Sequence, residues 1–435
     1  ADGSPVNSPT DLLYGTNVTA QTKATIKCTD PLPNGAYPMP RCYSDIMCMY
    51  GVQQNDINTI SSYRSYRSTS HLATFFAQFV SFDITSSKNT LSTYPMFLPA
   101  DDPFYVLNGS SPNSPQIDVN FLPANRSAGN DGTNPLTSGI NLVTPFLDLN
   151  NIYSSNDTLM LTKFRDTSSK RGKLKVSIAS NGDQYPPKTP SGDYDLGATS
   201  TRSRNIFTVA IHTIWLREHN RMCDQLYQIY QDSWTDDQYF QEARRWTTAF
   251  YQKAVAEEYI GAVLGRPLPA YQNYNPDLKP GIDTFFATVT FRYGHSELSD
   301  LYQIRDDHGD VLTNVALNDI KDLTLLENFG LEKVLLSMVL QRQEDVDNFF
   351  SNSTKKAIGP DQVTYDLASF DLIRSRDRGI PLYNKVRQFF NLPQAQSFSD
   401  ISNLDKVEAL VGVMCEPHLD GANFGMTMNA SIVTQ

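Results

Sequence analysis

The chain has 435 residues, of which 40% are hydrophobic, and carries a formal net charge of −11 at pH 7. This length allows two or three ordinary domains, or one large domain with a sizeable core. The negative charge argues against nucleic acid or an anionic membrane as a partner, and no apolar run approaches membrane-spanning length. No signal peptide precedes Ala1, so we expect the numbering to begin at a mature or trimmed N-terminus.

Residues 1–60 are dense in Pro, Gly, Asn and Ser and hold no period, which indicates loop. Apolar residues then recur at spacings of three and four, which predicts a helix over residues 71–84. These residues are Leu72, Phe75, Phe76, Phe79 and Phe82. Residues 86–142 return to loop with short extended pieces, and the compact run TPFLDLN follows at 144–150. Residues 165–200 are again loop, with a hairpin expected near 173–180.

Long helices are predicted from Ile206 onwards. The first runs to about Tyr230, and Thr235 with two following aspartates caps the second, which ends at Gly265. Further helices are expected near 331–343, 381–390 and 402–414. No repeat recurs at a fixed period. We therefore expect a mainly α-helical single domain over residues 1–435, with a loop-rich N-terminal segment (1–70), a helical core (71–435), long ordered loops and little β-structure.

Six Asn-X-Ser/Thr sequons, the acceptor pattern for N-glycosylation, are spread along the chain. Their asparagines are Asn17, Asn108, Asn125, Asn156, Asn352 and Asn429. A single sequon arises easily by chance. Six of them, in a chain poor in Lys and rich in Ser, Thr, Asn and Tyr, favour a secreted, extracellular glycoprotein.

The five cysteines cannot all pair within one chain. Cys28, Cys42 and Cys48 cluster in a loop-rich region, so we expect one disulfide bridge there. Cys223 and Cys415 lie in apolar, helix-like stretches, which is typical of buried thiols.

The stretch 289–295 reads VTFRYGH, an apolar run that ends in an Arg, an aromatic residue, a Gly and a lone His. A single His after an apolar run is more often a hydrogen-bonded core residue than a ligand. However, a neutral imidazole is a good axial ligand for haem iron, and Arg292 lies close enough in sequence to neutralise a haem propionate. His295 is therefore a candidate haem ligand if the rest of a haem pocket is present.

Residues 212–221 read HTIWLREHNR, which predicts a helix that mixes charge with bulky apolar residues. By itself the motif fits a buried helix whose Arg217, Glu218 and His219 form internal pairs. Followed seventy-odd residues later by FRYGH, it resembles the peroxidase–cyclooxygenase superfamily, and specifically the animal-type haem peroxidases. Further matches follow the family's order: DGS at 2–4, MPRCYS at 39–44, IRSRDRG at 373–379, YNKVR at 383–387 and EP at 416–417. The chain stops at Gln435, short of the family's usual C-terminal segment, so the resemblance also suggests a trimmed or truncated C-terminus.

The resemblance implies a haem protein whose proximal ligand is His295. The partner that accepts the other ring N–H of this imidazole, and so makes it more basic, falls on Asn384. Arg292 and Arg387 match the family's proximal arginines and are candidates to pair with haem propionates. The alternative for both is an internal ion pair.

The family also holds a calcium ion between the distal helix and a loop, and its ligands fall on five residues of this sequence. They are Asp83, Thr144, Phe146 through its carbonyl, Asp148 and Asn150, the last position being more often Ser in the family. Oxygen donors at alternate positions of a tight loop, with a carboxylate from elsewhere, suit a hard cation that takes six to eight oxygens. The resemblance therefore implies Ca²⁺ as a second cofactor.

On the distal side the sequence departs from the family. Gln78 and Asp83 are both in register, so Phe82 occupies the place of the distal His, and Ser81 that of an Asp that normally esterifies the haem. The second ester residue, normally a Glu after the catalytic Arg, falls within 201–205. With a one-residue gap, Arg202 is the catalytic Arg and Asn205 replaces the Glu. Without the gap, Thr201 and Arg204 occupy those places. Neither register supplies a carboxylate, so we expect haem b without ester links.

The loss of the distal His has a chemical consequence. Heterolytic cleavage of peroxide needs a base that moves a proton between the two oxygens, a contribution of about 10²–10⁴-fold that Phe82 cannot make. His71 lies eleven residues earlier, about three helical turns away, and cannot replace it. Two hypotheses about function follow. One is a haem-binding protein with impaired peroxidase chemistry. The other is an active oxidoreductase, either a slow peroxidase of aromatic donors or an oxygenase with an apolar distal pocket, acting on a small-molecule donor or apolar ligand.

Overall fold

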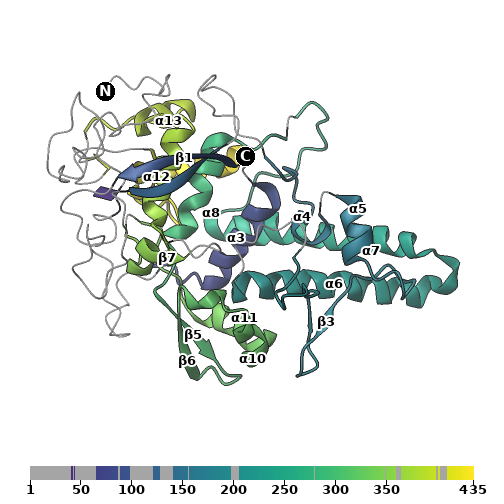
Figure 1. The fold of residues 1–435 in the computed structure, drawn as a ribbon. Helices are drawn as coiled ribbons and strands as arrows, with labels where there is room; N and C mark the ends of the chain where they lie inside the picture. Colours follow the sequence, from purple (N-terminus) through teal and green to yellow (C-terminus); the bar gives the residue numbers. More distant parts are fainter. Residues whose placement is uncertain are drawn as a thin grey trace.

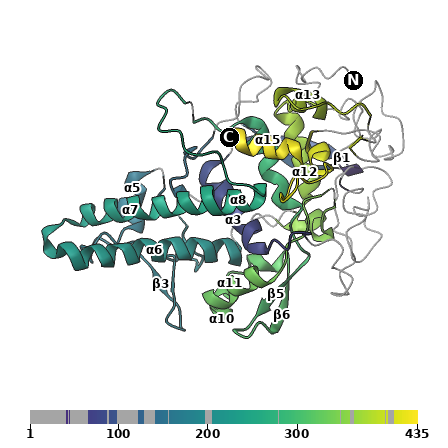
Figure 2. The same cartoon turned by 180° about the vertical axis from the view of Figure 1, so that it is seen from behind.

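The structure, a computed structural model, describes most of the chain from residue 65 onwards. The described residues are 41–42, 44, 65–86, 89–97, 121–127, 141–154, 156–196, 205–278, 280–347, 349–358, 364–397, 400–401 and 409–435. Helices dominate this part, which confirms the predicted mainly α architecture, and Figures 1 and 2 show one long helical hairpin projecting from a larger helical body. The proposed extent of the domain over 1–435 stays a prediction, because residues 1–40 lie outside the described part.

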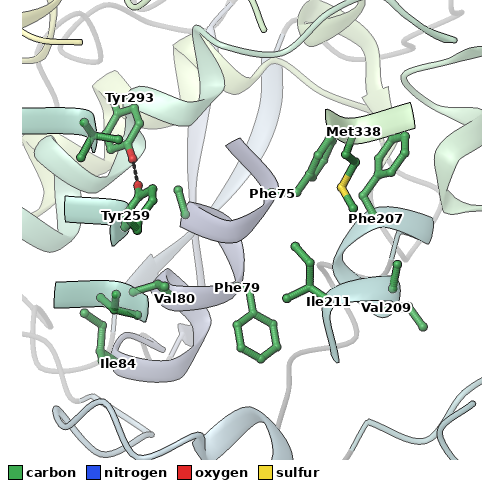
Figure 3. Close-up of a cluster of buried hydrophobic side chains, with 14 of the residues drawn as sticks. Phe75, Phe79, Val80, Ile84, Phe207, Val209, Ile211, Tyr259, Tyr293 and Met338 are labelled. Carbon is green, nitrogen blue, oxygen red and sulfur yellow. Dashed lines mark hydrogen bonds between the residues drawn. The ribbon is translucent and has the colours of Figure 1, made fainter. Parts of the chain in front are cut away.

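Helix α3 (His71–Ile84) lies at the centre of the molecule and has the predicted bounds. It packs against the long helix α6 (Ile206–Tyr230), against α11 (Leu331–Leu340) and against the short α4 (Asn150–Tyr153). Figure 3 shows its buried side chains between two groups of residues, with Phe207 and Ile211 of α6 on one side and Tyr259 and Tyr293 on the other. Full burial of a side chain of this kind contributes about 1.5–3 kcal/mol, so α3 holds the two groups together.

The projecting hairpin consists of α6 and α7 (Asp236–Lys253). Asn205 caps α6 by accepting hydrogen bonds from two backbone N–H groups, and Thr235 caps α7 through a capping box with Gln238. The chain then continues through the π-helix η7 (Ala254–Tyr259) and α8 (Ile260–Leu264). This helical stretch ends where predicted, at Gly265, which adopts a φ of 69° that favours glycine.

The remaining helices are shorter. They are α5 (Asp157–Leu159), η4 (Met160–Phe164), η6 (Gln231–Ser233), α9 (Thr284–Thr288), η8 (Thr290–His295), η9 (Asp319–Lys321), α10 (Thr324–Phe329), η10 (Asn352–Lys356), α12 (Leu367–Asp377), α13 (Tyr383–Phe389), α14 (Ala409–Met414) and α15 (Met426–Thr434). The helices predicted at 331–343 and 381–390 correspond to α11 and α13. The one predicted at 402–414 corresponds to α14, whose expected first residues, 402–408, lie outside the described part.

The described strands form four antiparallel pairs. They are β1 (Asn89–Phe97) with β2 (Phe121–Ser127), β3 (Ser177–Ile178) with β4 (Gln184–Tyr185), β5 (Leu301–Arg305) with β6 (Val311–Ala316), and β7 (Ala357–Ile358) with β8 (Thr364–Tyr365). The predicted hairpin near 173–180 is real, but its paired residues are shifted towards 177–185. The β1–β2 pair is longer than the short extended pieces expected in 86–142.

Part of the N-terminal segment is tied to this body through the carboxylate of Asp366. Arg41 and Ser44, from the MPRCYS motif, are buried, and both bond to the carboxylate of Asp366, which caps α12.

Cys223 is buried as predicted and Cys415 is half-buried. The expected bridge among Cys28, Cys42 and Cys48 stays a prediction, because Cys28 and Cys48 lie outside the described residues. Within the described part, no helix combines the length and apolar character needed to cross a bilayer.

Candidate functional site

His295 ends η8 and faces helix α12. Its Nδ1 lies 2.5 Å from Oδ2 of Asp371, a carboxylate whose side chain is only 1% exposed. Because a carboxylate accepts, Nδ1 carries a proton, and in the neutral ring Nε2 then carries the lone pair. Nε2 makes no hydrogen bond to any residue in the described part of the chain. The ring is therefore held in the tautomer that an iron ligand needs.

The structure corrects the prediction that Asn384 is the partner of His295. The Asn384 amide instead bonds to the backbone of Ala395, donating to its carbonyl at 2.9 Å and accepting from its N–H at 2.9 Å. The physical reason is packing: α12 contacts η8, whereas α13, which carries Asn384, follows the turn at Gly379 and packs against α14. The sequence feature that could have pointed to Asp371 as the partner is an acidic residue next to Leu372 and Ile373 in an otherwise buried helix.

Arginines gather on the same side of the site. Burial, together with Arg374 and Arg378 close by, lowers the pKa of Arg292 to about 9, and its Nε is buried with no hydrogen-bond partner among the described residues. Burial and Arg374 likewise lower the pKa of Arg378 to about 10. Cations that depress one another's pKa are stabilised by an added anion. The cluster therefore fits a bound carboxylate such as a haem propionate, the role predicted for Arg292.

Arg387 does not join this cluster. Its Nη1 lies 2.5 Å from Oε1 of Glu416 and donates to the hydroxyl of Tyr383 at 3.2 Å and that of Thr427 at 3.0 Å. The guanidinium is thus held by an internal carboxylate, which is the alternative we gave for this residue. The structure does not bring it to the site.

On α3, Gln78 and Phe82 lie one helical turn apart on the same face. Both are half-buried, although most residues of this helix are buried. Gln78 Oε1 accepts from Asn205 Nδ2 at 3.2 Å, so the distal helix is tied to the start of α6. Ser81 points instead towards Thr85, with 3.4 Å between their hydroxyls. Thr201, Arg202 and Arg204 lie outside the described residues, so the predicted catalytic Arg has no structural description.

The predicted calcium ligands converge around the carboxylate of Asp83. This carboxylate is fully buried and accepts from the backbone N–H of Leu149 at 3.3 Å and of Asn151 at 3.2 Å. Burial and the nearby Asp148 raise its pKa to about 7. Oδ1 of Asp148 and Oδ1 of Asn150 are buried without a partner among the described residues. Two close carboxylates and two oxygens with no donor are the arrangement that a hard cation satisfies.

The other predicted ligands belong to the same loop. Thr144 Oγ1 donates to Asp148 Oδ2 at 2.7 Å, and the carbonyl of Phe146 accepts from the N–H of Asp148 at 2.9 Å, leaving a second lone pair. The Phe146 side chain is 56% exposed. Leu149, fully buried, adopts a φ of 56°, a left-handed conformation that costs a non-glycine residue energy and that persists only where the surroundings enforce it.

Of the three residues expected to form internal pairs in the 212–221 motif, only His219 is fully buried, whereas Arg217 and Glu218 are half-buried at the surface of α6. Arg217 Nε donates to the carbonyl of Gln184 at 2.8 Å, and Glu218 pairs with Arg221. His219 is fully buried between the hydroxyl of Tyr153 at 2.9 Å and the carbonyl of Gly172 at 3.0 Å. His71 lies 2.9 Å from the hydroxyl of Ser299, at the first turn of α3 and so at the opposite end of this helix from Phe82.

The sequons have different fates. Asn156 is exposed and caps α5, and Asn352 is half-buried. Asn429 contradicts its prediction: it is 2% exposed, and its amide lies within hydrogen-bonding distance of the carbonyls of Phe424 and Gly425, so α15 leaves no room for a glycan there. Asn17 and Asn108 lie outside the described residues, and the side chain of Asn125, on β2, is not described.

The family model for animal haem peroxidases matches residues 51–435. The chain belongs to the animal haem peroxidase family. This confirms the resemblance carried by HTIWLREHNR and FRYGH, and membership implies haem binding.

Two curated relatives of this chain illustrate the range of similarity. Peroxinectin A from Dictyostelium discoideum is 26% identical over 324 residues, which cover 68% of this chain and 60% of that protein. Thyroid peroxidase from Homo sapiens is 29% identical over 310 residues, which cover 63% of this chain and 33% of that protein. The matched region thus spans between about a third and three fifths of the length of these relatives.

Solved structures share the fold of this chain. Peroxidase A from Dictyostelium discoideum has a TM-score of 0.78 at 23% identity and covers 99% of this chain and 88% of that chain. The fatty acid alpha-dioxygenase of Oryza sativa has a TM-score of 0.73 at 16% identity and covers 99% of this chain and 72% of that chain. At these identities the likeness establishes the architecture alone.

Proposed function

We propose that this chain is a haem-binding protein of the animal peroxidase fold whose peroxidase chemistry is impaired, and that it binds haem b without ester links. One observation carries the proposal: the proximal side offers a correctly oriented imidazole beside a cationic cluster, while the distal helix presents Phe82 where a base is required. When bound, haem supplies an iron centre that reacts with peroxides.

The proximal residues hold the group. His295 offers its Nε2 lone pair, and Asp371 accepts the Nδ1 proton and so fixes the ring orientation. Arg292, which is buried with Arg374 and Arg378 nearby, would bind a propionate carboxylate. Neither Ser81 at the first ester position nor Asn205 or Arg204 at the second carries a carboxylate, so haem would be held by coordination, ion pairing and apolar contacts.

The distal residues cannot perform the proton transfer that peroxide cleavage requires. Phe82 neither accepts nor donates a proton, and Gln78, being an amide, is not a base at neutral pH. Without proton transfer, cleavage is expected to be about 10²–10⁴-fold slower than with a placed imidazole. The benzene ring of Phe82 also makes this side of the site more apolar, which suits an apolar ligand better than water.

We further propose that Asp83, Thr144, the Phe146 carbonyl, Asp148 and Asn150 bind Ca²⁺. The raised pKa of Asp83 and the buried oxygens of Asp148 and Asn150 that lack donors support this. A divalent cation would stabilise both carboxylates in the ionised form and tie the 144–150 loop to α3.

We also propose that the protein is secreted and glycosylated, with residues 1–435 forming one domain. The exposed Asn156 is the sequon best placed to carry a glycan. Partners are expected to be a small-molecule donor or an apolar ligand rather than nucleic acid, because the net charge is −11.

Haem binding is tested with the absorption spectrum of the purified protein and of a His295→Ala variant. We expect a Soret band in the wild type and its loss or strong shift in the variant, because the axial nitrogen is removed. His308→Ala, which replaces an exposed histidine in the β5–β6 turn, serves as the matched control and should leave the band unchanged. A haem-saturated wild type whose spectrum is indifferent to His295→Ala would contradict the assignment.

A further inference from the structure

The projecting α6–α7 hairpin is held by neighbouring loops along one side. On that side, the amides of Asn220 on α6 and Gln252 on α7 bond to loop backbone. At 3.6 residues per turn, Ile214 projects about 120° away from Asn220, and Trp246 and Phe250 project about 120–160° away from Gln252. Because α6 and α7 run antiparallel and pack together, these three side chains share the side of the hairpin that faces away from the loops.

That side, which we call the bare face, presents large apolar side chains to solvent. Trp246 is 44% exposed and Phe250 39%, and their ring centroids lie 6.0 Å apart. On α6, Ile214 is 39% exposed, and Ile229, about four turns further along the helix, is 70% exposed. The indole N–H of Trp246 already donates to Glu242 at 3.0 Å, so covering this ring would leave no donor unpaired. A continuous set of exposed apolar side chains of this kind marks an interaction surface.

The charges that border the bare face cancel. They form three ion pairs, Glu218–Arg221, Glu242–Arg245 and Lys253–Glu257. Three acids and three bases give no net charge, whereas the whole chain carries −11. Two copies of so acidic a chain repel one another on average, and a neutral apolar face is where they can approach without that cost.

The size of the bare face suits a pair of hairpins. The 18 residues of α7 span about 27 Å, and two helices packed about 10 Å apart are about 20 Å wide. The footprint is roughly 500 Å² on each copy, or about 1,000 Å² for two, which is the lower limit for a specific interface. Because the hairpin projects from its body, two hairpins can lie antiparallel across a twofold axis with the two bodies at opposite ends (Figures 1 and 2).

We propose that the bare face of the α6–α7 hairpin is a self-association surface, through which two copies of this chain form a dimer of four packed helices. A twofold axis places the same patch on both copies, so each covers the exposed rings of the other. The small footprint implies a weak dimer, with a dissociation constant on the order of micromolar. The proposal does not rest on haem binding, so the protein should dimerise with or without haem.

The test is sedimentation equilibrium of the full chain as wild type, Trp246→Glu and Phe389→Glu. Phe389 is 71% exposed on α13, away from the hairpin, so its variant adds the same charge to an exposed ring elsewhere. We expect a monomer–dimer equilibrium in the wild type and a dissociation constant at least about tenfold higher in Trp246→Glu. Phe389→Glu should match the wild type. Both positions are on the surface, and thermal unfolding checks that both variants are folded.

Acrylamide quenching of tryptophan fluorescence gives a second readout, with the conservative variant Trp246→Phe. Quenching of the wild type should weaken as the concentration rises through the dissociation constant, because Trp246 becomes covered. Trp246→Phe should still dimerise, but its quenching should not vary with concentration. A wild type that stays monomeric about a hundredfold above the expected dissociation constant would overturn the proposal. A dimer that Trp246→Glu leaves intact, or that Phe389→Glu weakens equally, would assign self-association to another surface and overturn it as well.

Discussion

At the scale of single residues, the proposed haem site depends on two side chains, Asp371 on α12 and Phe82 on α3. Asp371 adds charge on the proximal side, and Phe82 removes a proton carrier on the distal side. Their effects differ in kind, because a hydrogen bond to an axial ligand changes electron density at the iron, while a distal base moves protons.

This difference makes Phe82→His a direct test of the impairment. We expect the variant to react with hydrogen peroxide about 10²–10⁴-fold faster than wild type, measured by stopped-flow absorption, because an imidazole is restored one turn from Gln78. Phe82→Leu keeps the apolar surface without a base and should react no faster than wild type. A wild-type rate normal for the family would contradict the impairment and favour the alternative of an active oxidoreductase.

At the scale of elements, α6 carries two histidines that are fully buried in the folded protein. Burial lowers the pKa of His219 to about 4 and the pKa of His212, about two helical turns earlier, to about 3. Both are bases whose pKa is depressed in the folded state. Between their folded values and the unfolded value near 6.5, the unfolded chain therefore binds more protons, and stability is lost as the pH falls through this window.

We expect the free energy of unfolding to drop by roughly 3 kcal/mol for His219 alone between pH 6.5 and pH 4, at 1.36 kcal/mol per pKa unit. Urea unfolding at several pH values measures this. His219→Gln keeps a side chain able to bond to Tyr153 and Gly172, and should flatten the dependence. The exposed His308→Gln should not alter it, and an unchanged slope in His219→Gln would show that other groups govern acid unfolding.

The proposed calcium site also belongs to this scale, because it joins two elements. Its carboxylates, Asp83 on α3 and Asp148 in the 144–150 loop, come from distant parts of the chain. We expect a calcium chelator to lower the thermal midpoint, since a ligand at a hundredfold excess over its Kd stabilises the folded state by about 2.7 kcal/mol. Asp148→Asn should abolish the response to calcium. Asp157→Asn, at the exposed start of α5, should retain it. A midpoint indifferent to chelator in the wild type would argue against the site.

At the scale of the whole molecule, the site is assembled from segments far apart in sequence. Asp371 meets His295 because α12 packs along η8, and α12 is anchored in turn by Arg41 and Ser44 from the N-terminal segment. At the base of the α6–α7 hairpin, Asn205 bonds to Gln78 of α3 and Gln252 donates to the carbonyl of Leu147, while the outer half of the hairpin projects from the body (Figure 1). Substitutions on the outer half of the hairpin should therefore affect stability more than haem binding.

The sequence alone determined what depends on local periodicity and motif. It predicted the bounds of α3, the start of α6, the cap of α7, the end at Gly265 and the family, because helical spacing and capping chemistry act between near neighbours. Only the tertiary structure decided the pairings: Asp371 rather than Asn384 beside His295, Arg387 held by Glu416, and Asn429 buried in α15. Which face of one helix meets another depends on packing across long stretches of chain, and a motif carries no information about it.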